Sequence, residues 1–218
     1  MGPDTHRVSL DAVRRHYQGL AADYEQHANR ACLNAYRALL RAHLGRCRAV
    51  LELGAGTSDL LNALDAPLAV AVDITAAMLG ARAPGRSVRV VADAAQLPFA
   101  NDRFDGIISV NLLEHAPYPK DIVSEAARVL RPGGCFLAIT PNGDVARLLH
   151  WIERLHLKLP EGPHHFLTRA AMAEAMASLD VLEHRRFLAC PVGPPAVTRT
   201  LDRLAAGWGL FQYVVARK

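Results

Sequence analysis

Lysine is almost missing from this chain of 218 residues, and no segment concentrates positive charge. Of the 25 lysine and arginine residues only three are lysines, Lys120, Lys158 and Lys218, and the formal net charge is +4 at pH 7. Arginine pairs such as Arg14-Arg15 are typical of solvated helix faces. A protein that binds nucleic acid usually gathers its positive charge, so the composition argues against a nucleic acid as partner.

Paired cysteines, the residue pattern of a signal peptide and long apolar runs are missing as well. The cysteines lie far apart without a CxxC motif, so we expect reduced, buried thiols and neither a disulfide framework nor a zinc site; they are Cys32, Cys47, Cys135 and Cys190. The first residues do not have the pattern of a signal peptide, and no uncharged apolar run is long enough to cross a bilayer. The sequence therefore predicts a cytoplasmic protein that binds no metal.

The chain does have an alternation of short apolar segments with helical ones. Half of its composition is hydrophobic, which is enough for the core of a single domain over residues 1–218. Residues 8–44 repeat apolar side chains every three or four positions, which predicts a helical cover over 1–44. Beyond it, strands are predicted at 49–53, 68–72, 88–92, 104–110 and 135–140, helices at 59–64, 75–82 and 120–130, and a turn at 131–134. This alternation indicates an α/β fold with a doubly wound sheet.

Residues 141–167 interrupt the alternation. Leucines, Trp151 and Ile152 recur there at helical spacing and are followed by "PEGPHHFLT". We interpret this segment as an inserted helical lid on the core at 45–140. A helix at 169–179 and strands at 181–189 and 210–216 would complete the sheet in the C-terminal part, 168–218.

Two alternate glycines follow the first predicted strand, in "VLELGAGTSD" at 50–59. Gly54 and Gly56 would let backbone N–H groups approach a ligand at the start of a helix. A dinucleotide fingerprint would have its third glycine where Asp59 stands, and an acid there would repel a pyrophosphate. No lysine follows the glycines, which excludes a phosphate-binding P-loop.

An acid ends the second predicted strand. Asp73 lies 21 positions after Glu52, where a doubly wound fold places a carboxylate that accepts hydrogen bonds from ribose hydroxyls. The ligand at this edge of the sheet is therefore predicted to contain a ribose.

Four segments in this order resemble the class I S-adenosylmethionine (SAM)-dependent methyltransferases, especially their small-molecule and quinone-type group. They are "VLELGAGTSDLL", "VAVDITAAML", "VVADAAQLPFANDRFDGIISVNLLEH" and "EAARVLRPGGCFLAITPN", and the similarity is close over about residues 45–142. The resemblance implies a Rossmann-like, mostly parallel sheet of seven strands and SAM as the cofactor. The family often has a third glycine where this chain has Ser58, which can cap the following helix.

The resemblance assigns residues to the methionine and ribose parts of SAM. It implies that Glu52, Gly54 and Gly56 lie beside the methionine part. Asp73 would bind both ribose hydroxyls. Asn111, at the end of the fourth strand, would meet the methionine amino group.

It also assigns residues to the adenine end. Asp93 would accept from the adenine amino group, and Ala94 would supply a backbone N–H beside it. Ile74 and Met78 are expected to pack near the adenine or the sugar, and Leu97 to flank the ring.

The sulfonium already activates the methyl group, so in-line positioning of the acceptor suffices, without a metal or a covalent nucleophile. A general base helps where the acceptor is a hydroxyl or a protonated amine, and histidine is the commonest choice. The catalytic candidates are His115, in "NLLEHAPYP", and His165 with its neighbour His164, in "HHFLT". A structural role stays open for each histidine. Tyr17 and Tyr24 would either close over the cofactor or belong to the core.

The sequence thus predicts a bacterial methyltransferase that acts on a small organic acceptor, with O-methylation as the leading interpretation and N- and C-methylation open. One alternative is a lipid or quinone acceptor reached at a membrane surface through the inserted helix. Another is a macromolecule such as RNA, although "NLLE" at 111–114 replaces the Asn/Asp-Pro-Pro-aromatic element of nucleic-acid N-methylases. A third is a non-catalytic protein that binds SAM or its demethylated product. The oligomeric state stays open.

Overall fold

The computed structural model describes residues 9–21, 24, 30–57, 60–81, 85–154, 162–187 and 208–218, and its centre is a seven-stranded sheet. The strands are β1 (Ala49–Leu53), β2 (Leu68–Asp73), β3 (Val88–Val91), β4 (Phe104–Val110), β5 (Leu130–Pro141), β6 (Asp180–Phe187) and β7 (Phe211–Arg217). Their order is β3-β2-β1-β4-β5-β7-β6, and β7 runs antiparallel to the other six strands. The predicted doubly wound, mostly parallel sheet is confirmed.

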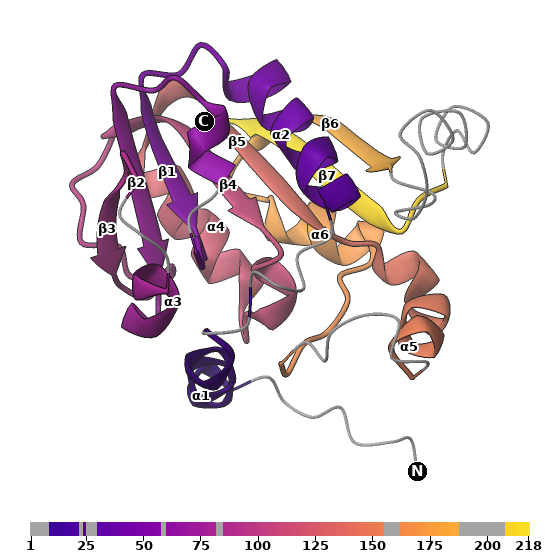
Figure 1. Cartoon of the computed structure of the whole chain (residues 1–218). Coiled ribbons are helices and arrows are strands. Elements are labelled where there is room, and N and C mark those ends of the chain that lie inside the picture. The colour runs from indigo at the N-terminus through magenta and orange to yellow at the C-terminus, as the bar shows by residue number, and fades with distance from the viewer. Residues whose placement is uncertain are drawn as a thin grey trace.

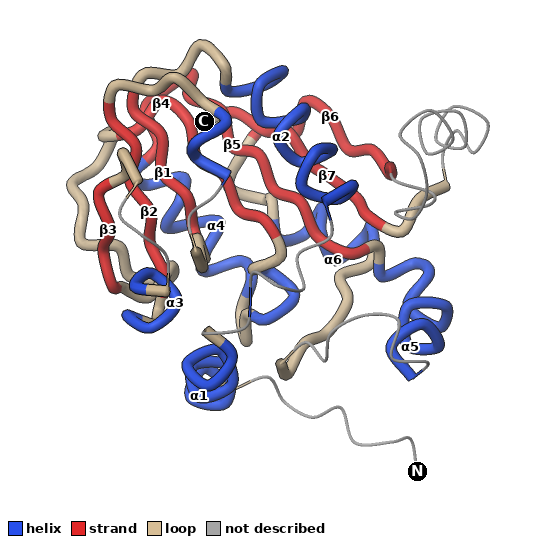
Figure 2. Tube along the Cα trace, viewed as in Figure 1, coloured by secondary structure: helices blue, strands red, loops and turns tan. Residues whose placement is uncertain are grey.

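Helices cover both faces of this sheet (Figures 1 and 2). The helix α2 (Arg30–Leu44) lies on one face, and α4 (Pro119–Val129) and α6 (Arg169–Ala175) lie on the other. Successive side chains of β1 point to opposite faces. Leu51 therefore packs in the core layer of α4 and α6, whereas Val50 packs in the layer of α2. Burial on both faces explains the unbroken apolar runs of the central strands.

The shorter elements gather around the edge where the parallel strands end. Figure 1 shows α1 (Leu10–Leu20) beyond the carboxyl ends of β1, β2 and β3, near α3 (Ala76–Gly80). The inserted helix is α5 (Ala146–Arg154), and the 3₁₀ turns are η2 (Leu60–Ala63), η3 (Leu113–His115) and η4 (Gly143–Val145). Ser9 caps α1 by accepting from the N–H of Ala12. The chain therefore places its N-terminal helix over the ligand edge of the sheet.

Two local predictions were wrong. The predicted helix at 59–64 is the short 3₁₀ turn η2. The predicted turn at 131–134 lies inside β5, because Gly133 donates to the carbonyl of Lys218 and Lys218 donates to that of Gly134. Gly133 has φ 77°, so glycine lets the strand bend and continue. Three residues with expectations, Ser58, Asp59 and Cys190, lie outside the described residues.

Three cysteines of the described part of the chain, Cys32, Cys47 and Cys135, are free thiols. Burial, with the nearby Asp105 carboxylate, raises the pKa of Cys47 to about 11, so this thiol stays protonated and unreactive at neutral pH. Within the described ranges, no helix has both the length and the apolarity to cross a bilayer.

Candidate functional site

A cavity of about 320 Å³ opens at the carboxyl edge of the sheet. Its walls come from the loops after β1, β2, β3 and β4, from the start of α4, and from α1 on the outer side. In a doubly wound sheet this edge is the expected ligand site, next to the point where the strand order reverses, here between β1 and β4. The fold therefore brings four separate loops to one cavity.

The loop after β1 depends on its glycines. Gly54 and Gly56 have φ of 64° and 52°, a region that other residues seldom adopt. A Cβ on Gly54 would lie 2.8 Å from Cδ1 of Leu112, so the backbone approaches the loop after β4 closely. The N–H of Gly56 donates to Oδ2 of Asp73 at 2.9 Å. The two glycines thus shape one wall of the cavity and tie it to β2.

Asp73 ends β2, is 9% exposed and lines the cavity. Its Oδ1 accepts from the backbone N–H of Thr75 at 2.9 Å and from the Thr75 hydroxyl at 2.8 Å. With Gly56 on Oδ2, three of the roughly four acceptor directions of a carboxylate are used. The structure therefore gives Asp73 two functions, holding the loops and presenting one further acceptor position.

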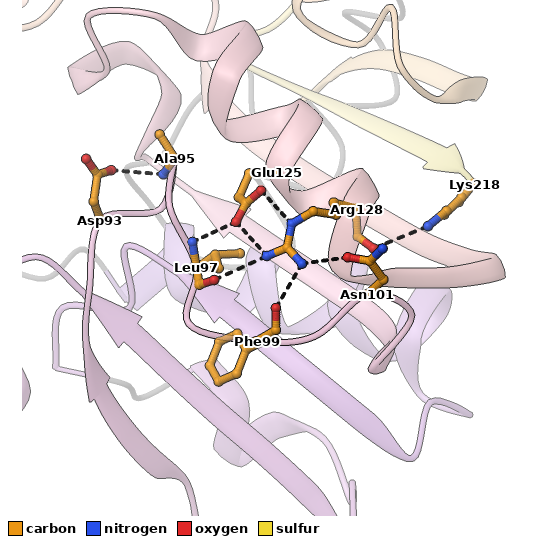
Figure 3. Close-up of polar contacts among 8 residues, drawn as sticks. All are labelled: Asp93, Ala95, Leu97, Phe99, Asn101, Glu125, Arg128 and Lys218. Carbon is orange, nitrogen blue, oxygen red and sulfur yellow. Dashed lines mark hydrogen bonds and ion pairs between the residues drawn. The ribbon is translucent and has the colours of Figure 1, made fainter.

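Asp93 follows β3 and lines the cavity together with Ala94. Its Oδ1 accepts from the N–H of Ala95 at 2.9 Å, which fixes the side chain in a turn (Figure 3). No residue of the described part of the chain donates to the second oxygen, Oδ2. That oxygen can accept from a ligand amino group.

Asn111 follows β4 in the left-handed region, with φ 50°, which asparagine tolerates better than most residues. Its N–H donates to the carbonyl of Ile139 at 2.9 Å. Its Oδ1 is buried, and no described residue hydrogen-bonds to it. A buried acceptor without a donor is unfavourable unless a ligand supplies one, and Asn111 lines the cavity.

His115 in η3 is 4% exposed and lines the cavity opposite α1. Its Nε2 lies 3.0 Å from the Tyr17 hydroxyl of α1, and its Nδ1 lies 3.0 Å from the carbonyl oxygen of Pro163. The rings of His115 and Tyr17 meet edge to face, with centroids 5.4 Å apart. His115 thus joins the N-terminal helix to the segment after α5.

A network that the sequence analysis missed holds the loop after β3 (Figure 3). Arg128 of α4 binds both oxygens of Glu125 and donates to the carbonyls of Leu97 and Phe99 and to Oδ1 of Asn101. These five hydrogen bonds use all five N–H groups of the guanidinium. The N–H of Leu97 donates to Glu125 as well, at 2.7 Å. The only sequence signal was the pair Glu125 and Arg128 at helical i, i+3 spacing.

The remaining candidates divide into two groups. Ile74, Met78 and Tyr24 line the cavity. Glu52 and Leu97 do not: both are buried, Glu52 within β1 and Leu97 in the core layer of α4.

His165 is not brought to the cavity. Its side chain is exposed, and its backbone N–H donates to the carbonyl of Glu114. The neighbouring His164 lies closer, with its ring centroid 5.9 Å from that of His115. Among the residues that the structure describes, no group of three or more His, Cys, Asp or Glu side chains is placed to hold a metal ion.

Comparison with known proteins agrees with this geometry. The model of the family described as "Methyltransferase domain" matches residues 51–138. Residues 51–138 are therefore similar to a methyltransferase domain. The matched segment runs from β1 into β5 and includes every predicted cofactor-binding residue and His115. It ends before His165.

A demethylmenaquinone methyltransferase of Roseiflexus sp. (strain RS-1) is 35% identical to this chain over 116 residues, which are 48% of this chain and 49% of that protein. The chain spans about half the length of the curated relatives it matches. A SAM-dependent methyltransferase structure from Thermotoga maritima has a TM-score of 0.69 at 15% identity, over 94% of this chain and 99% of that one. The N-methyltransferase NodS from Bradyrhizobium japonicum, in complex with S-adenosyl-L-homocysteine (SAH), has a TM-score of 0.64 at 15% identity, over 95% and 97%. The two structures show the shared fold.

Proposed function

We propose that this protein binds SAM in the cavity at the carboxyl edge of the sheet and transfers its methyl group to a small organic acceptor. The observation that carries the proposal is the buried Oδ1 of Asn111, an acceptor that no described residue satisfies, in one cavity with two strand-end carboxylates. These hydrogen-bond acceptors suit a ligand that carries donors, namely an ammonium group, ribose hydroxyls and an adenine amino group.

The residues fit SAM in a definite orientation. Asn111 would accept from the methionine amino group, and Asp93 would accept from the adenine amino group through Oδ2. Asp73 would accept from one ribose hydroxyl, rather than two, because Thr75 and the glycine loop already use its other positions. Bound SAM supplies a methyl group that its sulfonium has already activated. The protein's own part is to orient the acceptor and to exclude water.

The cavity favours a neutral acceptor. The described residues that line it include no lysine or arginine, and they include three aspartates, Asp73, Asp93 and Asp121. A phosphate or carboxylate on the acceptor would therefore find no fixed positive side chain. Apolar and aromatic side chains of α1 and its surroundings, among them Val13 and Tyr17, suit a ring. The demethylmenaquinone methyltransferase relatives support a quinone-type ring as one such acceptor.

We retain O-methylation as the proposed reaction, because a ring hydroxyl fits a neutral aromatic acceptor and a histidine beside the cavity can take up its proton. The proposal also includes cytoplasmic localisation and a single domain over 1–218. A lipid-linked acceptor at a membrane surface is the second candidate. The exposed Trp151 and Leu148 of α5, 59% and 37% exposed, favour it.

The test is transfer of a ¹³C- and ¹⁴C-labelled methyl group from SAM into host extract, separated into small-molecule, lipid, protein and RNA fractions. Label is expected in the small-molecule fraction, and the ¹³C chemical shift of the product separates O-methyl from N-methyl and C-methyl groups. Label in lipid would favour the membrane candidate, and label in RNA or protein would overturn the acceptor class. SAH binding without transfer would favour the non-catalytic alternative.

Two variants test whether SAH binds in the cavity. Asp93→Ala removes the acceptor for the adenine amino group and should weaken SAH binding about tenfold, which corresponds to the loss of one hydrogen bond. Asp65→Ala is the matched control, because this aspartate side chain is 95% exposed and does not line the cavity. Equal SAH affinity in both variants would contradict the placement of the cofactor.

A further inference from the structure

The hydrogen bonds of His115 determine which ring nitrogen carries the proton. Nδ1 lies 3.0 Å from the carbonyl oxygen of Pro163, which can only accept, so Nδ1 donates. The neutral ring then has its lone pair on Nε2, 3.0 Å from the Tyr17 hydroxyl. Tyr17 therefore donates to His115. The basic nitrogen of His115, Nε2, thus already accepts a hydrogen bond from the Tyr17 hydroxyl.

This arrangement changes which group an acceptor meets. Tyr17 and His115 both line the cavity, and the Tyr17 hydroxyl occupies the lone pair of Nε2. The two side chains come from α1 and η3, 98 positions apart in the chain. An acceptor hydroxyl in the cavity can hydrogen-bond to the oxygen of Tyr17 without displacing anything from His115. The Tyr17 oxygen and Nε2 of His115 thus form a chain of two proton acceptors that begins at Tyr17.

We infer, on the basis of the proposed function, that Tyr17 is the catalytic residue that takes the proton of the acceptor hydroxyl, and that His115 takes the proton of Tyr17. The acceptor O–H bond breaks, its proton moves to the Tyr17 oxygen, and the Tyr17 proton moves to Nε2 of His115. The electron pair of the acceptor oxygen forms the new bond to the methyl carbon, and the carbon–sulfur pair stays on sulfur, which gives SAH. The imidazolium of His115 then releases one proton to water.

The groups around the pair are compatible with a transient imidazolium. The ring of His164 is 5.9 Å from that of His115, and the ring of His16 is 5.2 Å from that of Tyr17. Tyr24 lies beyond Tyr17, with ring centroids 6.3 Å apart, and Asp121 is a carboxylate in the same cavity wall. The Glu114 side chain accepts from Thr140. No lysine or arginine is among the described residues that line the cavity.

The kinetic test uses Tyr17→Phe and His115→Asn in the full chain, with labelled SAM, and with catechol and the labelled fraction of host extract as acceptors. Each variant should lose about 100-fold or more in kcat. The double variant should lose little beyond either single one, because the two groups act as a unit. The KM for SAM should change much less than kcat. Tyr213→Phe and His43→Asn are the matched controls, because neither residue lines the cavity, and their kcat is expected to stay near that of the unmodified chain.

A second readout does not depend on turnover. In ¹⁵N NMR of the SAH complex, Nδ1 of His115 should appear protonated and Nε2 unprotonated, and Tyr17→Phe should shift the Nε2 resonance while Tyr213→Phe does not. A protonated Nε2 in the neutral ring, an unchanged shift in Tyr17→Phe, or full kcat in Tyr17→Phe would overturn the inference while the methyltransferase proposal stands. No transfer by the unmodified chain to any acceptor would end both proposals.

Discussion

At the scale of single residues, the cavity depends on backbone conformations that few side chains allow. Gly54 combines a left-handed φ of 64° with a close approach to Leu112. Asn111 has a similar conformation, with φ 50°, where it lines the same cavity. Strained backbone of this kind concentrates at functional sites, because the surrounding structure must hold it in place. The loops after β1 and β4 therefore support one another.

The substitution Gly54→Ala should lower the free energy of unfolding by about 2–3 kcal/mol, from left-handed strain of about 1–2 kcal/mol plus crowding. Gly133→Ala is the matched control, because Gly133 has φ 77° with nothing within 4 Å of an added Cβ. It should lose about 1 kcal/mol, from backbone strain alone. Urea denaturation measures both. Equal losses would mean that Leu112 moves aside and that the close approach is unimportant.

At the scale of elements, α4 holds the loop that carries the proposed adenine site. Arg128 joins three positions of residues 97–101 to the helix, and Glu125 joins the N–H of Leu97 (Figure 3). The loop has no regular secondary structure, so these contacts replace the backbone hydrogen bonds of a strand or helix. The position of Asp93 therefore depends partly on a helix some thirty residues later.

The hydrogen bond from Arg128 lowers the pKa of Glu125, although burial of the carboxyl raises it; the N–H of Leu97 and the charge of Arg128 lower it further. A lowered pKa in the folded state means that the stabilisation is complete above the usual glutamate pKa, about 4.3, and is lost as the pH falls through the lowered value. Glu125→Gln should lower the free energy of unfolding by about 1–2 kcal/mol at pH 7, and the difference should shrink below about pH 4.

The measurement is urea denaturation of the unmodified chain and Glu125→Gln between pH 3 and pH 7. Glu174→Gln, at an exposed position of α6, should show no pH-dependent difference. A difference for Glu125→Gln that stays constant down to pH 3 would mean that Arg128 does not hold this carboxyl in its charged form.

At the scale of the whole molecule, strand order decides where the ligand binds. The chain crosses from β3 at one edge to β4 beside β1, and the loops after β1 and β4 separate at that point. The helix α1 lies beyond the carboxyl ends of β1, β2 and β3 (Figure 1) and contributes residues to the lining of the cavity. Binding of SAH in the cavity should consequently stabilise the N-terminal helix, the four strand ends and α4 together.

SAH at 100 times its Kd should raise the free energy of unfolding by about 2.7 kcal/mol, and the midpoint of thermal unfolding by roughly 5–10 °C. Asp93→Ala at the same SAH concentration should retain only about 1.4 kcal/mol, if its affinity falls tenfold. Differential scanning calorimetry measures both, and a single transition is expected if residues 1–218 form one domain. An equal shift in both proteins would place SAH elsewhere.

The sheet type, the ligand edge and several of the cavity residues could be predicted from the sequence. These follow from local properties: apolar strands buried on both faces, glycines after β1, and the acids Asp73 and Asp93 just at strand ends. The resemblance to the methyltransferase family was also visible in the sequence, because the motifs of that family are short and ordered along the chain. Local pattern is a reliable guide wherever a residue's environment is set by its own strand or turn.

The contacts of the histidines and of Arg128, by contrast, became visible in the folded chain. His115 acquires its tautomer from Tyr17 and Pro163, which are 98 and 48 positions away, and no local pattern encodes that meeting. His165 stands in the motif that suggested an acceptor contact, yet the chain path leaves its side chain exposed. Hydrogen bonds act only over about 3 Å, so the chemistry of such groups depends on which distant segments the packed sheet brings together.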